Sequence, residues 1–528
     1  MTSGLSLSPP GSTKPTDVPA PRVVRFDRER LTIADIVDLA HGRARAALSG
    51  DPAFRAFIQR GADFVDRVLQ EDGVIYGVTT GYGDSCTVTV PLDLVGELPH
   101  HLYAFHGCGL GAFLNESQTR AVLATRLASL CRGYSGVSIR LLEQLAALLE
   151  HDILPLIPAE GSVGASGDLT PLSYVAAVMC GERDVVYAGG RMPAAAALAK
   201  AGLQPIRLRP KECLAIMNGT SVMTALACLA FERSTYLSQL ATRITAMASV
   251  ALDGNAHHFD ETLFSVKPHR GQQLVAARLR ADLASNRAAR NERRLQDRYS
   301  IRCAPHVIGV LEDALPWMEQ WIENELNSAN DNPIIDAEGE RVLHGGHFYG
   351  GHIAFVMDSL KQVVANIADL LDRQLALLVD PRFNHGLPAN LSGITGPRAA
   401  INHGLKAVQI GTSAWTAEAL KHTKPASVFS RSTESHNQDK VSMGTIAARD
   451  CLRVLELTEQ VVAALLIAVR QGVWLRGKQA ELTLTGALSE QLAALGKTIP
   501  PLEEDRALDA ELRELIRLIH GHAWPLYG

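Results

Sequence analysis

Aromatic side chains are scarce in this chain of 528 residues, of which Phe, Trp and Tyr make up 5%. The 8 cysteines are scattered and form no Cys-x-x-Cys pair, which argues against a disulfide framework or a structural zinc site and fits a reducing compartment. A basic excess is missing as well. The 51 Lys and Arg residues face 56 Asp and Glu, and the net charge of −5 argues against a general nucleic-acid binder.

Long apolar runs are also missing. Residues 461–469, one of the longest, fall well short of the roughly 20 apolar residues that a membrane-spanning helix needs. Residues 1–25 are rich in Pro, Ser and Thr around no apolar centre, so we expect a flexible tail and no signal peptide. These absences predict a cytoplasmic protein with no membrane partner.

Hydrophobic residues, by contrast, make up 47% of the chain, and Ala and Leu are abundant. These two residue types lose little side-chain freedom in a helix. Apolar residues recur at helical spacing over residues 31–69, 220–252, 353–379, 405–421 and 445–474. Helices this long, apolar on more than one face, are typical of a bundle that continues across subunit contacts. We therefore predict a mainly α-helical fold.

Polar segments rich in Asn, Gln, Gly and His separate these helices, and sites usually lie in such loops; they are residues 296–302, 327–332 and 432–439. Histidines gather at 100–106 and at 344–352 without a His-Glu-x-x-His arrangement, so we expect no metal. The arginine-rich residues 278–302 are interleaved with acidic residues and hold one aromatic, which favours a solvated surface over a nucleic-acid platform.

The most informative run is residues 161–171, Gly-Ser-Val-Gly-Ala-Ser-Gly-Asp-Leu-Thr-Pro. It matches neither glycine-rich phosphate-binding pattern, and Asp168 stands where a nucleophile elbow needs its last glycine. A tight turn into a helix capped by Asp168 is physically sound, but it does not require so ordered a run.

Within this run, Ala165, Ser166 and Gly167 suit a cyclisation of the backbone. The nitrogen of a glycine has no Cβ beside it and can approach the Ala165 carbonyl carbon in conformations that other residues resist. Ring closure with loss of two waters gives 4-methylidene-imidazol-5-one, called MIO below. The Ser166 Cβ then becomes an exposed electrophile, held in a strained turn of small residues.

Further motifs accompany this run in a definite order: residues 76–83, 132–136, 211–220, 296–302, 328–333, 345–348 and 436–444. Together they resemble the aromatic amino acid ammonia-lyases, which act on histidine, phenylalanine or tyrosine, and the related aminomutases. The resemblance covers nearly everything after the tail. It implies a smaller MIO-bearing domain over residues 26–219 and a fumarase/aspartase-like long-helix bundle with C-terminal helices over residues 220–528. It also implies a homotetramer with shared active sites and no external cofactor.

The resemblance gives each site residue a role. Tyr76 would be the general base for the β-proton, and Asn218 would hydrogen-bond the MIO oxygen. Arg302 would clamp the substrate carboxylate in a bidentate fork that a lysine cannot copy. The remaining residues would position the substrate and the electrophile, pack beside MIO, or assist around the amine; they are Gln296, Tyr299, Asn332, Phe348 and Glu418.

The substrate ring would meet Phe105 and His106. Histidine lyases resemble Ser-His at this pair, tyrosine lyases His-Leu, and plant and cyanobacterial phenylalanine lyases Phe-Leu, so Phe-His is a hybrid. Histidine lyases also carry a glutamate where this chain has Gln438. A neutral amide does not supply the charge that would hold an imidazole, and we expect phenylalanine or tyrosine, deaminated to a cinnamic-type acid and ammonia. The alternatives are histidine giving urocanate, an aromatic 2,3-aminomutase, or an inactive helical scaffold.

Overall fold

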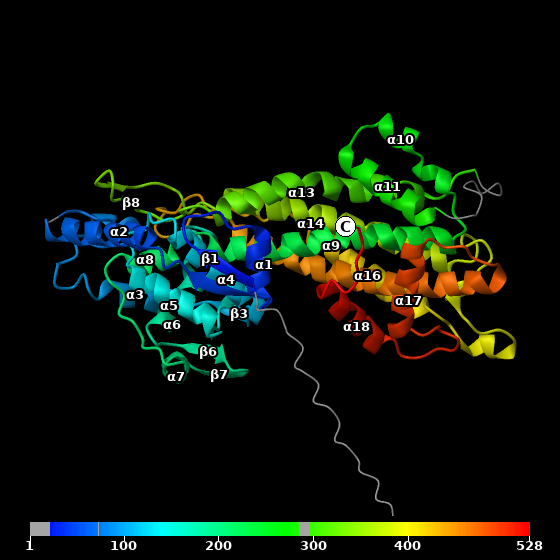
Figure 1. Ribbon diagram of the computed structural model, residues 1–528, viewed down its shortest axis with the longest axis horizontal. Coiled ribbons are helices and arrows are strands. Elements are labelled where there is room, and N and C mark those ends of the chain that lie inside the picture. Colours follow the sequence, from blue (N-terminus) through cyan, green and yellow to red (C-terminus); the bar gives the residue numbers. More distant parts are fainter. Residues whose placement is uncertain (1–21, 72, 285–294, 528) are drawn as a thin grey trace, which may run out of the picture.

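Long helices run along the molecule, and the N-terminal elements gather at one end of them (Figure 1). The structure is a computed structural model that describes residues 22–71, 73–284 and 295–527. It confirms the predicted mainly α-helical fold. The division into an N-terminal domain and a bundle remains a prediction.

The N-terminal part holds short helices and small strands. Its elements are β1 (Arg22–Phe26), α1 (Ile33–Ala40), β2 (Ala44–Leu48), α2 (Pro52–Gln70), η1 (Gly83–Thr87), α3 (Leu98–Phe105), β3 (Leu110–Phe113), α4 (Glu116–Leu130), α5 (Ile139–Glu150), β4 (Leu154–Pro155), β5 (Pro158–Glu160), α6 (Leu169–Met179), β6 (Asp184–Tyr187), β7 (Gly190–Pro193), α7 (Ala194–Lys200) and α8 (Glu212–Met217).

The second part consists mainly of the long helices. Its elements are α9 (Ser221–Ala251), η2 (Ala256–Phe259), α10 (Glu261–Ser265), α11 (Arg270–Leu283), α12 (Tyr299–Arg302), α13 (Ala304–Leu326), β8 (Ile334–Asp336), β9 (Arg341–Leu343), α14 (Gly351–Val379), η3 (Ala389–Leu391), η4 (Pro397–Ile401), α15 (Lys406–Lys421), η5 (Ser427–Phe429), α16 (Gly444–Gln479), α17 (Gly486–Thr498) and α18 (Asp509–His520).

Two predictions about the N-terminal residues need correction. β1 pairs in parallel with β2, so residues 22–25 of the predicted tail belong to a sheet, whereas residues 1–21 lie outside the described residues. The helical spacing over residues 31–69 corresponds to two helices with β2 between them. The cause is tertiary: β2 obtains its backbone partners from β1, and spacing within one segment cannot show this.

The bundle forms where long-period apolar spacing predicted it. α14 packs against α16, and α9 packs against α13 and α16. α9 is buried almost all round because it carries apolar or small residues on every face. Within the described residues, no helix is both long and apolar enough to cross a membrane.

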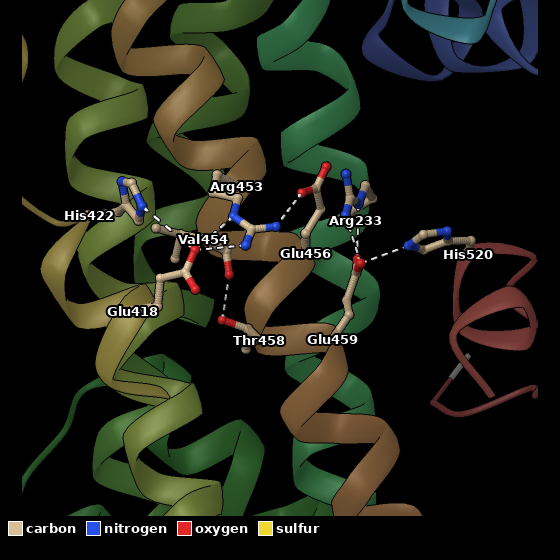
Figure 2. A network of polar contacts seen from close by, with 9 residues as sticks. All are labelled: Arg233, Glu418, His422, Arg453, Val454, Glu456, Thr458, Glu459 and His520. Carbon is tan, nitrogen blue, oxygen red and sulfur yellow. Dashed lines mark hydrogen bonds and ion pairs between the residues drawn. The ribbon is translucent and has the colours of Figure 1, made fainter. Parts of the chain in front are cut away.

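A buried carboxylate joins the C-terminal helix to this bundle. Glu459 of α16 is 2% exposed and accepts hydrogen bonds from Arg233 of α9 at 2.6 and 2.9 Å (Figure 2). Its carboxylate also lies 2.7 Å from His520 Nε2 of α18. Burial acts against ionisation of this carboxylate, but Arg233 and His520 more than offset it and lower the pKa of Glu459 to about 2. Glu459 is therefore ionised in the folded protein.

We expect Glu459→Gln to lower the free energy of unfolding by about 3 kcal/mol, because it leaves Arg233 without its counter-ion. Since the folded-state pKa is lowered, this stability is present above the unfolded-state value near ~4.3 and is lost as the pH falls toward 2. Denaturant unfolding between pH 7 and pH 2 measures both effects. A variant as stable as the wild type at pH 7 would contradict the prediction.

Candidate active site

A cavity of about 820 Å³ lies where loops before the long helices meet the N-terminal part. Its wall combines the loop before η1, the end of α3, the loop before α6, the end of α8, and the loops that precede α14 and α16. Most of the predicted site residues line it: Tyr76, Phe105, His106, Ala165, Ser166, Asn218, Asn332, Phe348 and Gln438.

The Ser166 loop lies against the residue that follows Asn218. Gly219 donates its N–H to the Ser166 carbonyl at 3.1 Å, and its own carbonyl accepts from the Asp168 N–H at 2.7 Å. Gly167, between them, has φ of +73°, and a Cβ there would lie 2.0 Å from the Gly219 oxygen. Only glycine fits this position, because a side chain would collide with the Gly219 backbone and the positive φ disfavours other residues.

Asp168 differs from its predicted role. It occupies the residue before α6, but its carboxylate accepts from the N–H groups of Val222 and Met223, at 3.0 and 2.9 Å, in the first turn of α9. The hydroxyls of Ser162 and Thr445 donate to the other oxygen. The buried start of a 31-residue helix has unpaired N–H groups and a positive dipole end, which explains why the side chain turns there. Asp168 thereby joins the Ser166 loop to α9 and α16, and burial raises its pKa.

The Tyr76 hydroxyl oxygen accepts a hydrogen bond from the Gly83 N–H at 2.7 Å. Burial raises the pKa of Tyr76, and nearby Glu434 raises it further, whereas the bond from Gly83 opposes this shift. The isolated chain therefore keeps Tyr76 as a phenol. A backbone donor is already placed to stabilise the phenolate once the proton leaves.

Glu434 is a cavity residue that the sequence analysis missed. It lies four residues before Gln438 and accepts from the Asp84 N–H with both oxygens, at 2.9 and 3.0 Å. It thus joins the loop of Tyr76 to the loop of Gln438. The available signal was its position in the polar segment 432–439, which already carried a predicted site residue.

Asn218 is held by groups that can only accept. Its Nδ2 donates to the Asn332 carbonyl at 2.8 Å and to Asp331 Oδ1 at 3.2 Å. Among the described residues, its buried Oδ1 has no partner. Asn332 Oδ1 in turn accepts from the Gly345 N–H at 2.9 Å. The Asn218 side chain and the Asn332 backbone therefore form one hydrogen-bonded unit in the cavity wall.

The pair predicted to meet the substrate ring combines an exposed ring, Phe105, and a partly buried one, His106. Phe105 is 59% exposed, and its ring centroid lies 4.3 Å from that of His106. His106 Nδ1 lies 3.0 Å from the Leu102 carbonyl, which can only accept, so this nitrogen carries the proton. Burial lowers the pKa of His106 and so favours the neutral ring. Its Nε2 is then an acceptor, while Gln438 Oε1 accepts from the Thr433 hydroxyl at 2.9 Å.

Three predicted residues lie far from this cavity. Gln296, Tyr299 and Arg302 belong to α12 and the residues before it. The Ser300 carbonyl of α12 accepts from Gln374, 23 residues beyond the start of α14 and hence about 35 Å along that helix from the cavity. Tyr299 is 71% exposed, and the Arg302 guanidinium lies 4.7 Å from its ring centroid. One chain does not bring these residues to its own Ser166.

Glu418 also lies outside the cavity wall. It belongs to α15 and accepts from Arg453 of α16 at 2.7 and 3.2 Å, with His422 4.0 Å away (Figure 2). Arg453 lies nine residues into α16, about 14 Å from the helix start that contacts the Ser166 loop. The carboxylates that line the cavity are instead those of Glu434 and Asp439.

Comparison with known proteins places these features in context. The family model described as Aromatic amino acid lyase matches residues 31–497. The histidine ammonia-lyase of Bacillus subtilis (strain 168) is 35% identical over 495 residues, which cover 93% of this chain and 96% of that protein.

Solved structures are similar over the same length. Tyrosine aminomutase from Streptomyces globisporus matches with a TM-score of 0.88 and 32% identity, covering 96% of this chain and 97% of that one. Histidine ammonia-lyase from Trypanosoma cruzi matches with a TM-score of 0.86 and 30% identity, covering 95% of this chain and 94% of that one.

Proposed function

Since the chain belongs to the aromatic amino acid lyase family, we propose that it removes ammonia from an aromatic L-amino acid and leaves the α,β-unsaturated acid. One observation carries this proposal: a single cavity gathers Tyr76, Ser166 and Asn218 from segments far apart in the sequence. The resemblance assigns these residues to proton removal, to the electrophile and to its support. An inactive helical scaffold has no need for this combination.

The family is the MIO-dependent class of ammonia-lyases and aminomutases, which uses no external cofactor. The residues of this chain fit the group. Gly167 has the required positive φ, and the buried Asn218 has an orphaned polar atom in the same cavity wall. Formed from Ala165, Ser166 and Gly167, the group would supply an electrophilic carbon that activates the substrate for loss of ammonia, by attack either from the amine or from the aromatic ring.

The side chains around the electrophile divide the remaining work. Tyr76 removes the β-proton, and the Gly83 N–H stabilises the resulting phenolate. Asn218, held by the Asn332 carbonyl, would hydrogen-bond the MIO oxygen, and Phe348 would pack beside the MIO ring. We assign the substrate amine to Glu434 in place of Glu418, because Glu434 lines the cavity and Glu418 is paired with Arg453.

We propose a homotetramer with shared active sites. The support is the separation of about 35 Å between this chain's Ser166 cavity and the α12 residues that would hold the substrate carboxylate. Tyr299 and Arg302 lie at the opposite end of the bundle and would complete the cavity of a neighbouring subunit. A monomer would then lack both the carboxylate clamp and activity.

For the substrate, the relatives favour histidine over our sequence-based expectation of phenylalanine or tyrosine. Several relatives carry the name histidine ammonia-lyase, and we propose histidine first. His106 supports a ring that donates a hydrogen bond, because its Nε2 is left as an acceptor; phenylalanine would leave it unpaired. Tyrosine is the second candidate, since its hydroxyl can donate to the same nitrogen and Gln438 lacks the charge expected for an imidazole.

Initial rates of ammonia release from histidine, tyrosine and phenylalanine test this order. We expect kcat/KM to be highest for histidine and lower by about tenfold or more for phenylalanine, which would leave the His106 acceptor without a hydrogen bond. Gln438→Glu should raise the histidine preference. A wild type that prefers phenylalanine would overturn the role of His106, and a β-amino acid product would show an aminomutase.

Arg302→Lys should raise KM about tenfold or more and change kcat less, because a point charge replaces the two-pronged fork. Steady-state kinetics over a wide substrate range separate the two constants. Arg298→Lys is the matched control, since its guanidinium lies 4.7 Å from the Phe383 ring centroid and it has no assigned substrate contact. An unchanged KM for Arg302→Lys would remove Arg302 from the carboxylate site.

A further inference from the structure

A buried ion pair lies beneath the amides of the cavity wall. Lys211 Nζ and Asp331 Oδ2 are 2.6 Å apart, and both side chains are fully buried. Lys211 precedes α8, whose far end leads to Asn218, and Asp331 immediately precedes Asn332. The pair therefore joins the two segments that bring Asn218 and Asn332 to the cavity.

The second oxygen of Asp331 holds both amide residues. Oδ1 accepts from the backbone N–H of Asn332 at 2.7 Å and from Nδ2 of Asn218 at 3.2 Å. Because an ionised carboxylate can only accept, Asp331 dictates which end of the Asn218 amide faces it. Lys211 occupies the other oxygen and keeps the carboxylate from turning.

Stability alone is a weak reason for such a pair. The desolvation of two buried charges often cancels their attraction, and apolar residues of similar size are frequently as stable. What apolar residues cannot supply is an oxygen that accepts from Asn332 and Asn218 together. The role that distinguishes this pair is therefore geometric.

We propose that Lys211 and Asp331 are positioning residues that hold Asn218 and Asn332 in the orientation the deamination requires. The proposal rests on the proposed ammonia-lyase function. Asp331 Oδ1 orients the two asparagines directly, and Lys211 acts through Asp331 by holding its carboxylate in place. Neither residue lines the cavity.

The test uses paired substitutions, because a single one would leave a buried charge unpaired. Lys211→Met with Asp331→Leu removes the oxygen, and we expect kcat to fall about 10²-fold with KM changed about threefold or less, as for a small misplacement of a site group. Lys211→Met with Asp331→Asn keeps an oxygen in the same place and should restore kcat to within about tenfold of wild type.

A matched control comes from a second buried pair. Lys361 and Asp358 of α14 are 2.8 Å apart, and Lys361 also lies 3.4 Å from Asp450. Asp358 accepts from two backbone N–H groups, those of Ala426 and Ser427, where Asp331 accepts from one backbone N–H and one side-chain amide. Lys361→Met with Asp358→Leu should leave kcat within about threefold of wild type, since it removes the same kind of pair away from Asn218.

The unfolding midpoint and the mass of the peptide carrying residues 165–167 accompany each kinetic measurement. If the Asp331→Leu pair fails to fold, Asp331→Ala with Lys211→Met removes the same oxygen without added bulk. The positioning role would be overturned by an unchanged kcat in the Asp331→Leu pair, or by an equal fall of kcat in the Asp331→Asn pair. It would also be overturned if the peptide from the Asp331→Leu pair kept its full calculated mass, because the electrophile would then not have formed. Wild-type protein that releases no ammonia from any of the three amino acids would instead overturn the proposed function, and this role with it.

Discussion

Ser166→Ala should abolish turnover, with kcat reduced by about 10³-fold or more, because the electrophilic carbon comes from the Ser166 side chain. The fold and assembly should remain, since Ser166 shares its loop with the unchanged Asp168 contacts to α9 and α16. Ammonia release and the unfolding midpoint measure the two expectations.

The mass of the peptide carrying residues 165–167 provides the control for Ser166→Ala. In the wild type it should be lower by two waters, and in the variant it should equal the value calculated from the sequence. Turnover at the wild-type rate would refute the assignment of Ser166. An inactive variant that had lost its folded state would instead contradict the expectation that the fold does not depend on Ser166.

Tyr76→Phe should lower kcat by about 10²–10⁴-fold and leave KM nearly unchanged, because the ring stays and the proton acceptor goes. The phenolate fraction of a tyrosine grows as the pH rises, and burial, which raises the pKa of Tyr76, moves this growth to higher pH. The wild-type rate should therefore increase toward alkaline pH, and the variant should lack this limb. Full pH–rate profiles of both proteins make the measurement.

Tyr103→Phe is the matched control for Tyr76→Phe. It removes a hydroxyl that donates to Glu182 at 2.7 Å, outside the cavity wall, so the rate and its pH profile should stay near those of the wild type. An alkaline limb that survives in Tyr76→Phe would show that another group removes the β-proton.

The long helices were predictable because their apolar spacing extends over many turns. α9 and α14 begin and end within two residues of the predicted ranges 220–252 and 353–379. β1 and β2 were not predictable in this way, because each is short and obtains its partner from the other. Asp168 illustrates the same limit. Its place before α6 could be predicted from neighbouring residues, but its carboxylate binds a helix more than 50 residues further along the chain.

In the candidate site, too, some residues could be predicted from local motifs and others could not. Tyr76, Ser166 and Asn218 lie in ordered motifs, and their shared cavity agrees with that order. Glu434 was missed because nothing in the local pattern separates it from other acidic loop residues. Arg302 and Tyr299 have motifs as distinct as the others, yet they lie far from the cavity. A sequence motif identifies a residue type but not where the folded chain places that residue.

The central claim is that Ala165, Ser166 and Gly167 form an internal electrophile in this protein. The most direct measurement is the mass of the peptide that contains these three residues, released from the purified full-length wild type. The expected mass is two waters below the value calculated from the sequence. A peptide with the full calculated mass, from protein that is folded, would contradict it.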